Sequence, residues 1–278
     1  MESPSPASAR FSAAPWQDAP VATGGESLFV IGDVHGCTPL LAAMLDGIAA
    51  LAPPPRSRLV FLGDLIDRGP DSIGSLRLWA REQPVPGIDR VHRLMGNHEQ
   101  MLLLACGTGP DAMAAQELWL SLNGDTMLAE LRAAAGQPEA PPGPALLRQA
   151  LGEAVPARLR AQQGHLRLGN LVLVHGGVDP RRPMQEFLGL PWDALAARPG
   201  HWAWITHGFL DWRDGFDGQV VVHGHTPPAK HRAISGLAEP VGLAEGRLCL
   251  DGGSAVTGAV AGAQLEDGRF RLLWSHAA

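Results

Sequence analysis

One unit recurs along the sequence: a short apolar run, then glycine with polar residues, then a helical pattern. The apolar runs lie at 28–31, 59–62, 91–95, 171–174 and 220–222. Each is nearly continuous, as in strands covered on both faces. The polar residues Asp33, Asp64 and Asn97 after the first three runs are 31 and 33 residues apart, about the length of a βαβ unit. The pattern predicts an α/β protein, with a first helix that has Thr38 as N-cap and Pro39 at its first position.

Composition narrows the class of protein. The chain has 278 residues, 45% hydrophobic and 18% charged, with a net charge of -6. This balance is typical of a globular enzyme and argues against nucleic acid as a partner. No apolar run is long enough to span a membrane, and three widely spaced cysteines do not form a disulfide framework. We therefore expect a soluble cytoplasmic protein.

Three segments differ from the repeating unit. Residues 1–26 are rich in Ser, Pro and Ala, lack the apolar centre of a signal peptide, and are expected to form a mobile tail before a domain over 27–278. Residues 110–163 contain Ala- and Leu-rich helical stretches and are expected to form a small helical cap insertion. The segment LEDGRF at 265–270 indicates a β-hairpin.

Five predicted strands are followed by side chains of types that can bind metals. Ligands of open α/β sheets bind at the carboxyl ends of the strands. One such residue alone is more often a surface or hydrogen-bonded group, so the inference rests on their joint occurrence. Carboxylate, amide and imidazole ligands suit Mn, Fe or Zn, and six of them are too many for one ion. The candidates are Asp33, His35, Asp64, Asn97, His175 and His225.

The motifs GDVHG, GDLIDRG, GNHE, HGG and GHT occur in that order. Together they resemble the bacterial phosphoprotein phosphatase-like branch of the calcineurin-like metallophosphoesterases over about residues 27–260. The resemblance implies a four-layer α/β/β/α sandwich of two mixed β-sheets. The segment ELWLSLNGDTML resembles the cap over the site in bacterial members. Symmetrical dinucleoside tetraphosphate hydrolases share the scaffold but typically replace the residues that match Asp67 and Glu99, which favours the phosphatase branch.

The resemblance also implies a cofactor of two divalent ions, Mn²⁺ first and Fe or Zn as alternatives. It assigns Asp33, His35 and Asp64 to one ion, and Asp64, Asn97, His175 and His225 to the other, so that Asp64 bridges them. A hydroxide shared by the two ions would attack phosphorus in line.

The same resemblance implies roles for three residues beside the ions. His98 would be the general acid, Asp67 would fix the tautomer of His98, and Arg68 would bind the phosphoryl oxygens. Substrate binding is also expected from Asn97.

Two positions depart from the family pattern. Met95 and Thr206 stand where arginine is common, and the second arginine usually binds phosphate. We expect His207 to take its place in substrate binding, with Arg181, Arg182 and Arg213 as alternatives.

Other residues near these motifs receive structural interpretations. His223 is two residues from His225 and is expected to support the site from behind the ligands. His92, His165, His201, His231 and His276 match no motif and are expected to be structural or exposed. Cys37, directly after GDVHG, is expected to be a packed side chain, and Trp202, Trp204 and Trp212 could wall a substrate cleft.

The leading prediction is a metal-dependent hydrolase of phosphomonoesters, with a Ser/Thr phosphoprotein as the first candidate substrate and a small phosphoester as the other. Hydrolysis of a dinucleoside polyphosphate or another nucleotide is the alternative among enzymes. A metal-binding regulatory protein with weak activity is the alternative outside them, but the intact His98, Asp67 and Arg68 argue against it.

Overall fold

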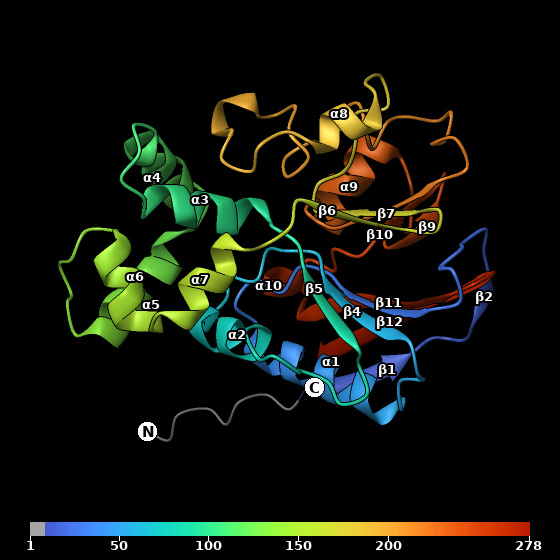
Figure 1. The fold of residues 1–278 in the computed structure, drawn as a ribbon, viewed down its shortest axis with the longest axis horizontal. Coiled ribbons are helices and arrows are strands. Elements are labelled where there is room, and N and C mark those ends of the chain that lie inside the picture. Colours follow the sequence, from blue (N-terminus) through green and yellow to red (C-terminus); the bar gives the residue numbers. More distant parts are fainter. Residues whose placement is uncertain (1–8) are drawn as a thin grey trace.

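A computed structural model describes residues 9–278 and places two mixed β-sheets at the centre of the molecule (Figure 1). The larger sheet has the strand order β1-β12-β11-β3-β4-β5, with β2 paired to β12. Its strands β3, β4 and β5 are parallel, and the others pair antiparallel. Its members are β1 (Ala9–Ala13), β2 (Gln17–Asp18), β3 (Ser27–Ile31), β4 (Ser57–Phe61), β5 (Arg90–Arg93), β11 (Ala259–Glu266) and β12 (Arg269–Ala277).

The smaller sheet has the order β6-β7-β8-β10-β9, and its central strands β7, β8 and β10 are parallel. Strands β6 and β9 close its two edges in antiparallel pairing. The members are β6 (His165–Leu168), β7 (Leu171–Val174), β8 (Val220–His223), β9 (Gly242–Ala244) and β10 (Arg247–Cys249). Each sheet thus contains three neighbouring parallel strands, at one edge of the larger sheet and in the centre of the smaller one.

The alternation of side chains along each strand separates two cores. In β3, Leu28 and Val30 pack between the sheets, whereas Phe29 and Ile31 belong to the core shared with the helices. The core between the sheets is formed by aliphatic residues of both, including Val60, Leu62, Leu171, Leu173, Val220, Val222, Leu248 and Leu250. Because both faces of each sheet are covered, the strands read as continuous apolar runs, as the sequence predicts.

Helices form the two outer layers (Figure 1). Helices α1 (Thr38–Ala50) and α2 (Ser72–Trp79) lie beside the larger sheet, and α8 (Met184–Leu188) and α9 (Pro228–Ser235) beside the smaller one. The remaining short elements are the 3₁₀ turn Leu195–Ala197 and α10 (Ser254–Thr257). The predicted four-layer α/β/β/α sandwich of two mixed sheets is confirmed. Among the described residues, no helix has the length and apolarity needed to cross a bilayer.

The segment 110–163 projects from one end of the sandwich as a helical group (Figure 1). It follows α3 (Asn97–Ala105), which begins at the GNHE motif. Its helices are α4 (Ala112–Ser121), α5 (Asp125–Ala135), α6 (Pro144–Leu151) and α7 (Ala154–Arg160). Their apolar residues, among them Trp119, Met127, Leu131 and Leu147, join the core shared with α1 and α2.

The N-terminal segment differs from the prediction of a mobile tail over 1–26. Residues 1–8 lie outside the described part, but β1 pairs along its length with β12, from Ala9 opposite Ala277 to Ala13 opposite Leu273. The indole of Trp16 lies under the guanidinium groups of Arg269 and Arg271, 4.3 and 4.7 Å from its ring centre. Contacts with β12, which is distant in the sequence, therefore order residues 9–18, although the composition of this segment indicates disorder.

The start of α1 also differs by one residue from the prediction. Cys37 is the N-cap, and Thr38 is already helical. The Thr38 hydroxyl donates to the carbonyl oxygen of Asp71 at 2.7 Å, which joins α1 to the loop before α2. The predicted hairpin at 265–270 is confirmed, with Glu266 opposite Arg269.

Contact between β1 and α1 yields a test of the N-terminal strand. A Cβ on Gly47 of α1 would overlap the ring of Phe11 in β1. Alanine normally stabilises a helix interior by about 1 kcal/mol relative to glycine. We expect Gly47→Ala instead to lower the free energy of unfolding by about 1–3 kcal/mol through overpacking. In a Phe11→Ala background, the same change should become neutral or stabilising.

Urea unfolding of the wild type, both single variants and the double variant measures this coupling. If Gly47→Ala stabilised the chain equally in both backgrounds, the packing of β1 on α1 would be wrong.

Candidate active site

The carboxyl ends of the parallel strands of both sheets bring the six predicted metal-ligating side chains together. Asp33 and His35 follow β3, Asp64 follows β4, and Asn97 begins α3 after β5. From the smaller sheet, His175 follows β7 and His225 follows β8. Five of the six side chains are 2% exposed or less.

Asp64 lies between two groups of potential ligands. One group joins it to His35 and His98, and the other to His175 and His225. The carboxylate oxygen Oδ2 is 3.5 Å from His35 Nε2, and Oδ1 is 3.3 Å from His175 Nε2. Asp33 approaches the first group with its Oδ2 4.0 Å from His35 Nε2. This arrangement is compatible with a carboxylate that serves two ions.

Main-chain carbonyls orient three imidazoles. His35 Nδ1 lies 2.8 Å from the oxygen of Ile66, and His175 Nδ1 lies 3.0 Å from that of Leu62. His225 Nε2 lies 3.2 Å from the oxygen of Trp204. Because a carbonyl only accepts, each of these nitrogens must donate, and in the neutral ring that binds metals the other nitrogen carries a lone pair. Hydrogen bonds of this kind commonly hold metal-ligating histidines.

The lone pairs of two of these imidazoles consequently face an amide oxygen, which is also an acceptor. His175 Nε2 lies 3.1 Å from Asn97 Oδ1, and His225 Nδ1 lies 2.8 Å from the same oxygen. Two nitrogen lone pairs and an amide oxygen facing one another lack a donor between them. A cation among these atoms would satisfy all of them, so the donor set fits a metal.

Buried negative charge supports the same conclusion. Burial, together with the nearby carboxylates of Asp251 and Asp64, raises the pKa of Asp33 well above its usual range. Burial alone would also raise the pKa of Asp64, but the positive charge that the His175 and His98 rings carry when protonated holds it well below its usual range. Three buried carboxylates around one another need more positive charge than Arg68 supplies, and divalent ions would provide it.

Several site residues have a strained backbone. The φ angles of His35, Asp64, Asp67, Arg68 and His225 are 45°, 52°, 68°, 66° and 68°. Non-glycine residues in this left-handed region cost of order 1 kcal/mol or more and tend to cluster at functional sites. Close packing of the loops adds a constraint, since a Cβ on Gly224 would overlap Asp33 Oδ1.

Asp67 and His98 form a buried pair beside these ligands. His98 Nδ1 lies 2.6 Å from Asp67 Oδ2, and both side chains are 0% exposed. Burial lowers the pKa of His98 to about 4 and raises the pKa of Asp67 well above its usual range. Since the two groups share one proton, the pair as a unit sets the acidity of His98 Nε2.

Trp119 of the helical insertion completes this pair. Its indole Nε1–H donates to Asp67 Oδ2 at 2.8 Å, which stabilises the carboxylate form. The segment around Trp119 is expected to cap the site, but the sequence does not single out this residue, because the contact spans 52 positions and belongs to no local pattern.

Arg68 points into the centre of the site. Its guanidinium donates from Nη1 to His35 Nε2 at 2.8 Å and from Nη2 to His98 Nε2 at 3.1 Å. Both nitrogens are therefore engaged by histidines of the site, and Arg68 would have to exchange these partners to bind a phosphoryl oxygen.

Glu99 holds the loop that carries Asp64. Its carboxylate accepts from the main-chain N–H groups of Asp64 at 2.8 Å, Leu65 at 2.7 Å and Gly96 at 3.1 Å. Burial raises the pKa of Glu99 to about 7. Glu99 thus joins the ends of β4 and β5, and it positions Asp64 without facing the cavity.

A cavity of about 570 Å³ opens over these residues. Its lining includes His35, Arg68, Asn97 and His225. Leu122 and Asn123 of the insertion, Trp204, Thr206 and the 91% exposed Val256 of α10 contribute to its walls. Lys230 of α9 lines it as well and is the only lysine in the chain.

The expected replacements for the missing arginine do not reach this cavity. His207 is exposed and lies outside the lining, whereas the adjacent Thr206 is part of it. Arg181 lies over the ring of Trp212, Arg182 pairs with Glu186 at 3.0 Å, and Arg213 pairs with Glu245 at 2.9 Å. The role of His207 in substrate binding stays a prediction, whereas Lys230 is a cation that lines the cavity beside Arg68.

The tryptophans expected at a substrate cleft also differ in position. Of the three tryptophans expected at a cleft, only Trp204 lines this cavity, and Trp202 is buried in the core. Asp251 is a buried carboxylate that helps to raise the pKa of Asp33 and that the sequence motifs do not single out. It follows β10 with 1% exposure, and its Oδ2 has no partner among the described residues. Its position directly after an apolar strand, in CLDGGS, repeats the pattern of the other site residues.

Comparison with known proteins gives relatives of two activities. Over 100 residues, 35% of this chain, it is 41% identical to a protein of Salmonella typhimurium named serine/threonine-protein phosphatase 1. Over 165 residues, 58% of the chain, it is 32% identical to an Acidovorax protein named symmetrical bis(5'-nucleosyl)-tetraphosphatase. The matches span 39% and 48% of the lengths of these relatives.

Solved structures agree on the fold. A putative diadenosine tetraphosphatase superposes with a TM-score of 0.51 and 20% identity, over 91% of this chain and 95% of the other. The sequence profile of the calcineurin-like phosphoesterases matches residues 27–258, which include all six candidate ligands. The chain belongs to the calcineurin-like phosphoesterase family, whose members use divalent metal ions.

Proposed function

We propose that this protein is a two-metal phosphomonoesterase of the serine/threonine phosphatase type, with the phosphorylated side chain of a protein as substrate. The buried Asp67–His98 pair carries this proposal. An alkoxide such as a seryl oxygen is a poor leaving group and needs a proton as the P–O bond breaks. The products of dinucleoside tetraphosphate cleavage leave as stable phosphate anions, for which a general acid matters less.

Asp33, His35 and Asp64 would hold one ion, and Asp64, Asn97, His175 and His225 the other, with Mn²⁺ as the first candidate. When bound, such ions polarise phosphoryl oxygens and activate water near neutral pH. The orienting carbonyls and the buried imidazole lone pairs support this assignment, because neutral imidazole is the form that binds metals.

The remaining residues would bind substrate and move a proton. Arg68 would turn its two N–H groups from the histidines to the phosphoryl oxygens, and this exchange would leave His98 Nε2 free. With Asp67 ionised and His98 doubly protonated, Nδ1–H would stay bonded to Asp67 while Nε2 gives its proton to the leaving oxygen, and His98 would be left as a neutral imidazole. Trp119 would keep Asp67 Oδ2 in place while the proton moves.

Hydrolysis of a dinucleoside polyphosphate is the second candidate function. The apolar cavity walls at Leu122, Trp204 and Val256 could hold a nucleobase as well as a peptide. Relatives named symmetrical bis(5'-nucleosyl)-tetraphosphatase, such as the Acidovorax protein, motivate the comparison.

Leaving-group dependence distinguishes the two functions. With Mn²⁺, we expect a higher kcat/KM for a phosphoserine peptide than for a symmetrical dinucleoside tetraphosphate. His98→Asn should lower kcat on the phosphopeptide by about 10²–10⁴-fold. The loss should be smaller for p-nitrophenyl phosphate, because p-nitrophenolate leaves without a proton. Equal losses on the phosphopeptide and on p-nitrophenyl phosphate would contradict the role of His98 as an acid. Faster turnover of the dinucleoside tetraphosphate than of the phosphopeptide by the wild type would favour the second function.

Asp64→Asn tests the bridging assignment. Mutation of a residue that hydrogen-bonds to a metal ligand typically lowers activity by about 10–100-fold. Loss of a ligand shared by two ions should lower activity by more than this. It should also reduce bound metal by more than Asn97→Ala, which affects one ion. Metal analysis of the purified variants gives the ion count. Retention of two ions with near-normal turnover by Asp64→Asn would refute the bridge.

Lys230→Met tests the cation at the cavity wall. A phosphomonoester is largely dianionic at neutral pH and a diester is monoanionic. Loss of the positive charge of Lys230 should therefore weaken the binding of monoesters more than that of diesters. Because Lys230 is exposed, we expect KM for p-nitrophenyl phosphate to rise only about 2–5-fold. KM for bis-p-nitrophenyl phosphate should change less, and Arg232→Met on the same helix serves as the matched control.

Thr206→Arg completes this comparison. In the Lys230→Met background, a guanidinium from position 206 should restore monoester affinity, since Thr206 also lines the cavity. Unchanged monoester-to-diester ratios in all variants would show that neither position meets the phosphate.

A further inference from the structure

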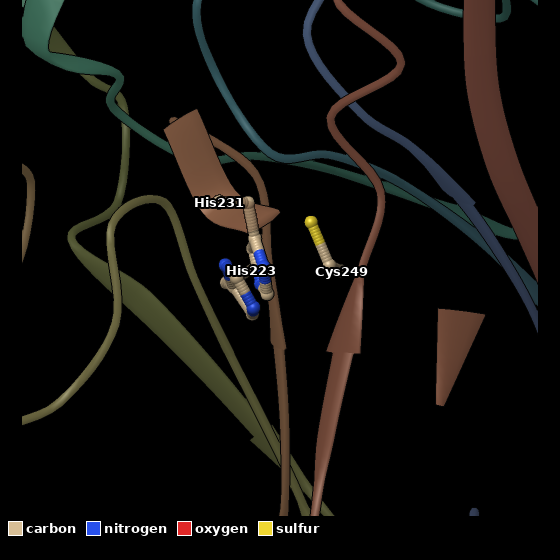
Figure 2. A group of neighbouring side chains, drawn as sticks. All are labelled: His223, His231 and Cys249. Atoms are coloured by element: carbon tan, nitrogen blue, oxygen red, sulfur yellow. The ribbon is translucent and has the colours of Figure 1, made fainter. Parts of the chain in front are cut away.

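A second cluster of metal-competent side chains lies outside the cavity. It consists of His223 at the end of β8, His231 in α9 and Cys249 at the end of β10 (Figure 2). One ligand atom from each residue lies within 4.8 Å of the others. The three residues are 0%, 1% and 2% exposed. None of them belongs to the ligand set of the active site.

The fold brings these residues together from three elements. His223 and Cys249 are direct partners on the neighbouring parallel strands β8 and β10. The imidazole of His231 stacks on that of His223, with ring centres 5.8 Å apart and planes inclined by 17°. A shared ligand would therefore join two strands of the smaller sheet to the helix beside it.

The hydrogen bonds of the two histidines leave one nitrogen of each without a partner. His223 Nδ1 lies 3.1 Å from the carbonyl oxygen of Gly224, so it donates. His231 Nδ1 lies 3.0 Å from Ser235 Oγ. Nε2 of both rings is buried and has no hydrogen-bond partner among the described residues. Unpaired buried polar atoms are costly and uncommon in native proteins.

The donor set differs from that of the active site. Two imidazoles and a thiol suit Zn²⁺, whereas the active site, which adds carboxylate and amide oxygens to its imidazoles, suits a harder ion such as Mn²⁺. Zinc binding would release the Cys249 proton and form one bond to sulfur and two to nitrogen, with water at a fourth position. We propose that His223, His231 and Cys249 form a separate zinc site that fixes α9 against β8 and β10.

Cobalt substitution tests this proposal, because Co²⁺ bound to thiolate gives a near-ultraviolet charge-transfer absorption that oxygen and nitrogen ligands do not give. The full-length protein is stripped with a chelator and titrated with Co²⁺ alone. We expect wild type to develop the thiolate band and Cys249→Ala to lose it. Cys106→Ala, which alters another buried cysteine, and Cys37→Ala, beside the active site, should retain the band.

Metal content gives a second measurement on the same proteins. After growth with zinc, Cys249→Ala and His231→Gln should each contain one ion fewer per chain than wild type and Cys106→Ala. Absence of the thiolate band in wild-type protein would overturn the proposal, whatever the folding of the variants. Persistence of the band in Cys249→Ala would overturn it as well. Both outcomes leave the phosphatase proposal intact, because activity with Mn²⁺ is measured separately.

Discussion

The ionised, buried carboxylate of Asp64 is the constraint on which the rest of the site depends. A lone carboxylate in this position would cost several kcal/mol, so its surroundings must compensate it. The His98 main-chain N–H donates to its Oδ1 at 3.0 Å, and the imidazoles of His35 and His175 flank it. Glu99 fixes the main chain of Asp64. Position 96 requires glycine, since a Cβ there would overlap Asp64.

Much of the fold and most of the site follow from local sequence patterns. Apolar runs identify the strands, and the residues after them reach a common edge because parallel strands end on the same side of a sheet. For this reason Asp33, Asp64, Asn97, His175 and His225 lie together as the sequence predicts. The same rule could have identified Asp251, which also follows a parallel strand.

The features that the sequence does not predict involve contacts that no local pattern encodes. Strand β1 is short, has no continuous apolar run, and forms by pairing with β12 at the other end of the sequence. Trp119 reaches Asp67 from a separate insertion, and Lys230 reaches the cavity from a helix beside the smaller sheet. His207 matches a sequence neighbour of the expected arginine, yet the turn exposes it and directs Thr206 into the cavity lining.

The strand order of the larger sheet has a consequence for how the active site is assembled during synthesis. Strands β11 and β12 follow every site residue in the sequence but lie between β1 and β3, which precede them. Gly32, next to Asp33, donates its N–H to Ala261 of β11 at 3.0 Å. Until β11 has left the ribosome, β3 has an open hydrogen-bonding edge, of the kind that favours association with other chains. The loop of Asp33 thus gains its last neighbour late, and chains stalled before residue 259 would lack a formed active site and expose this edge.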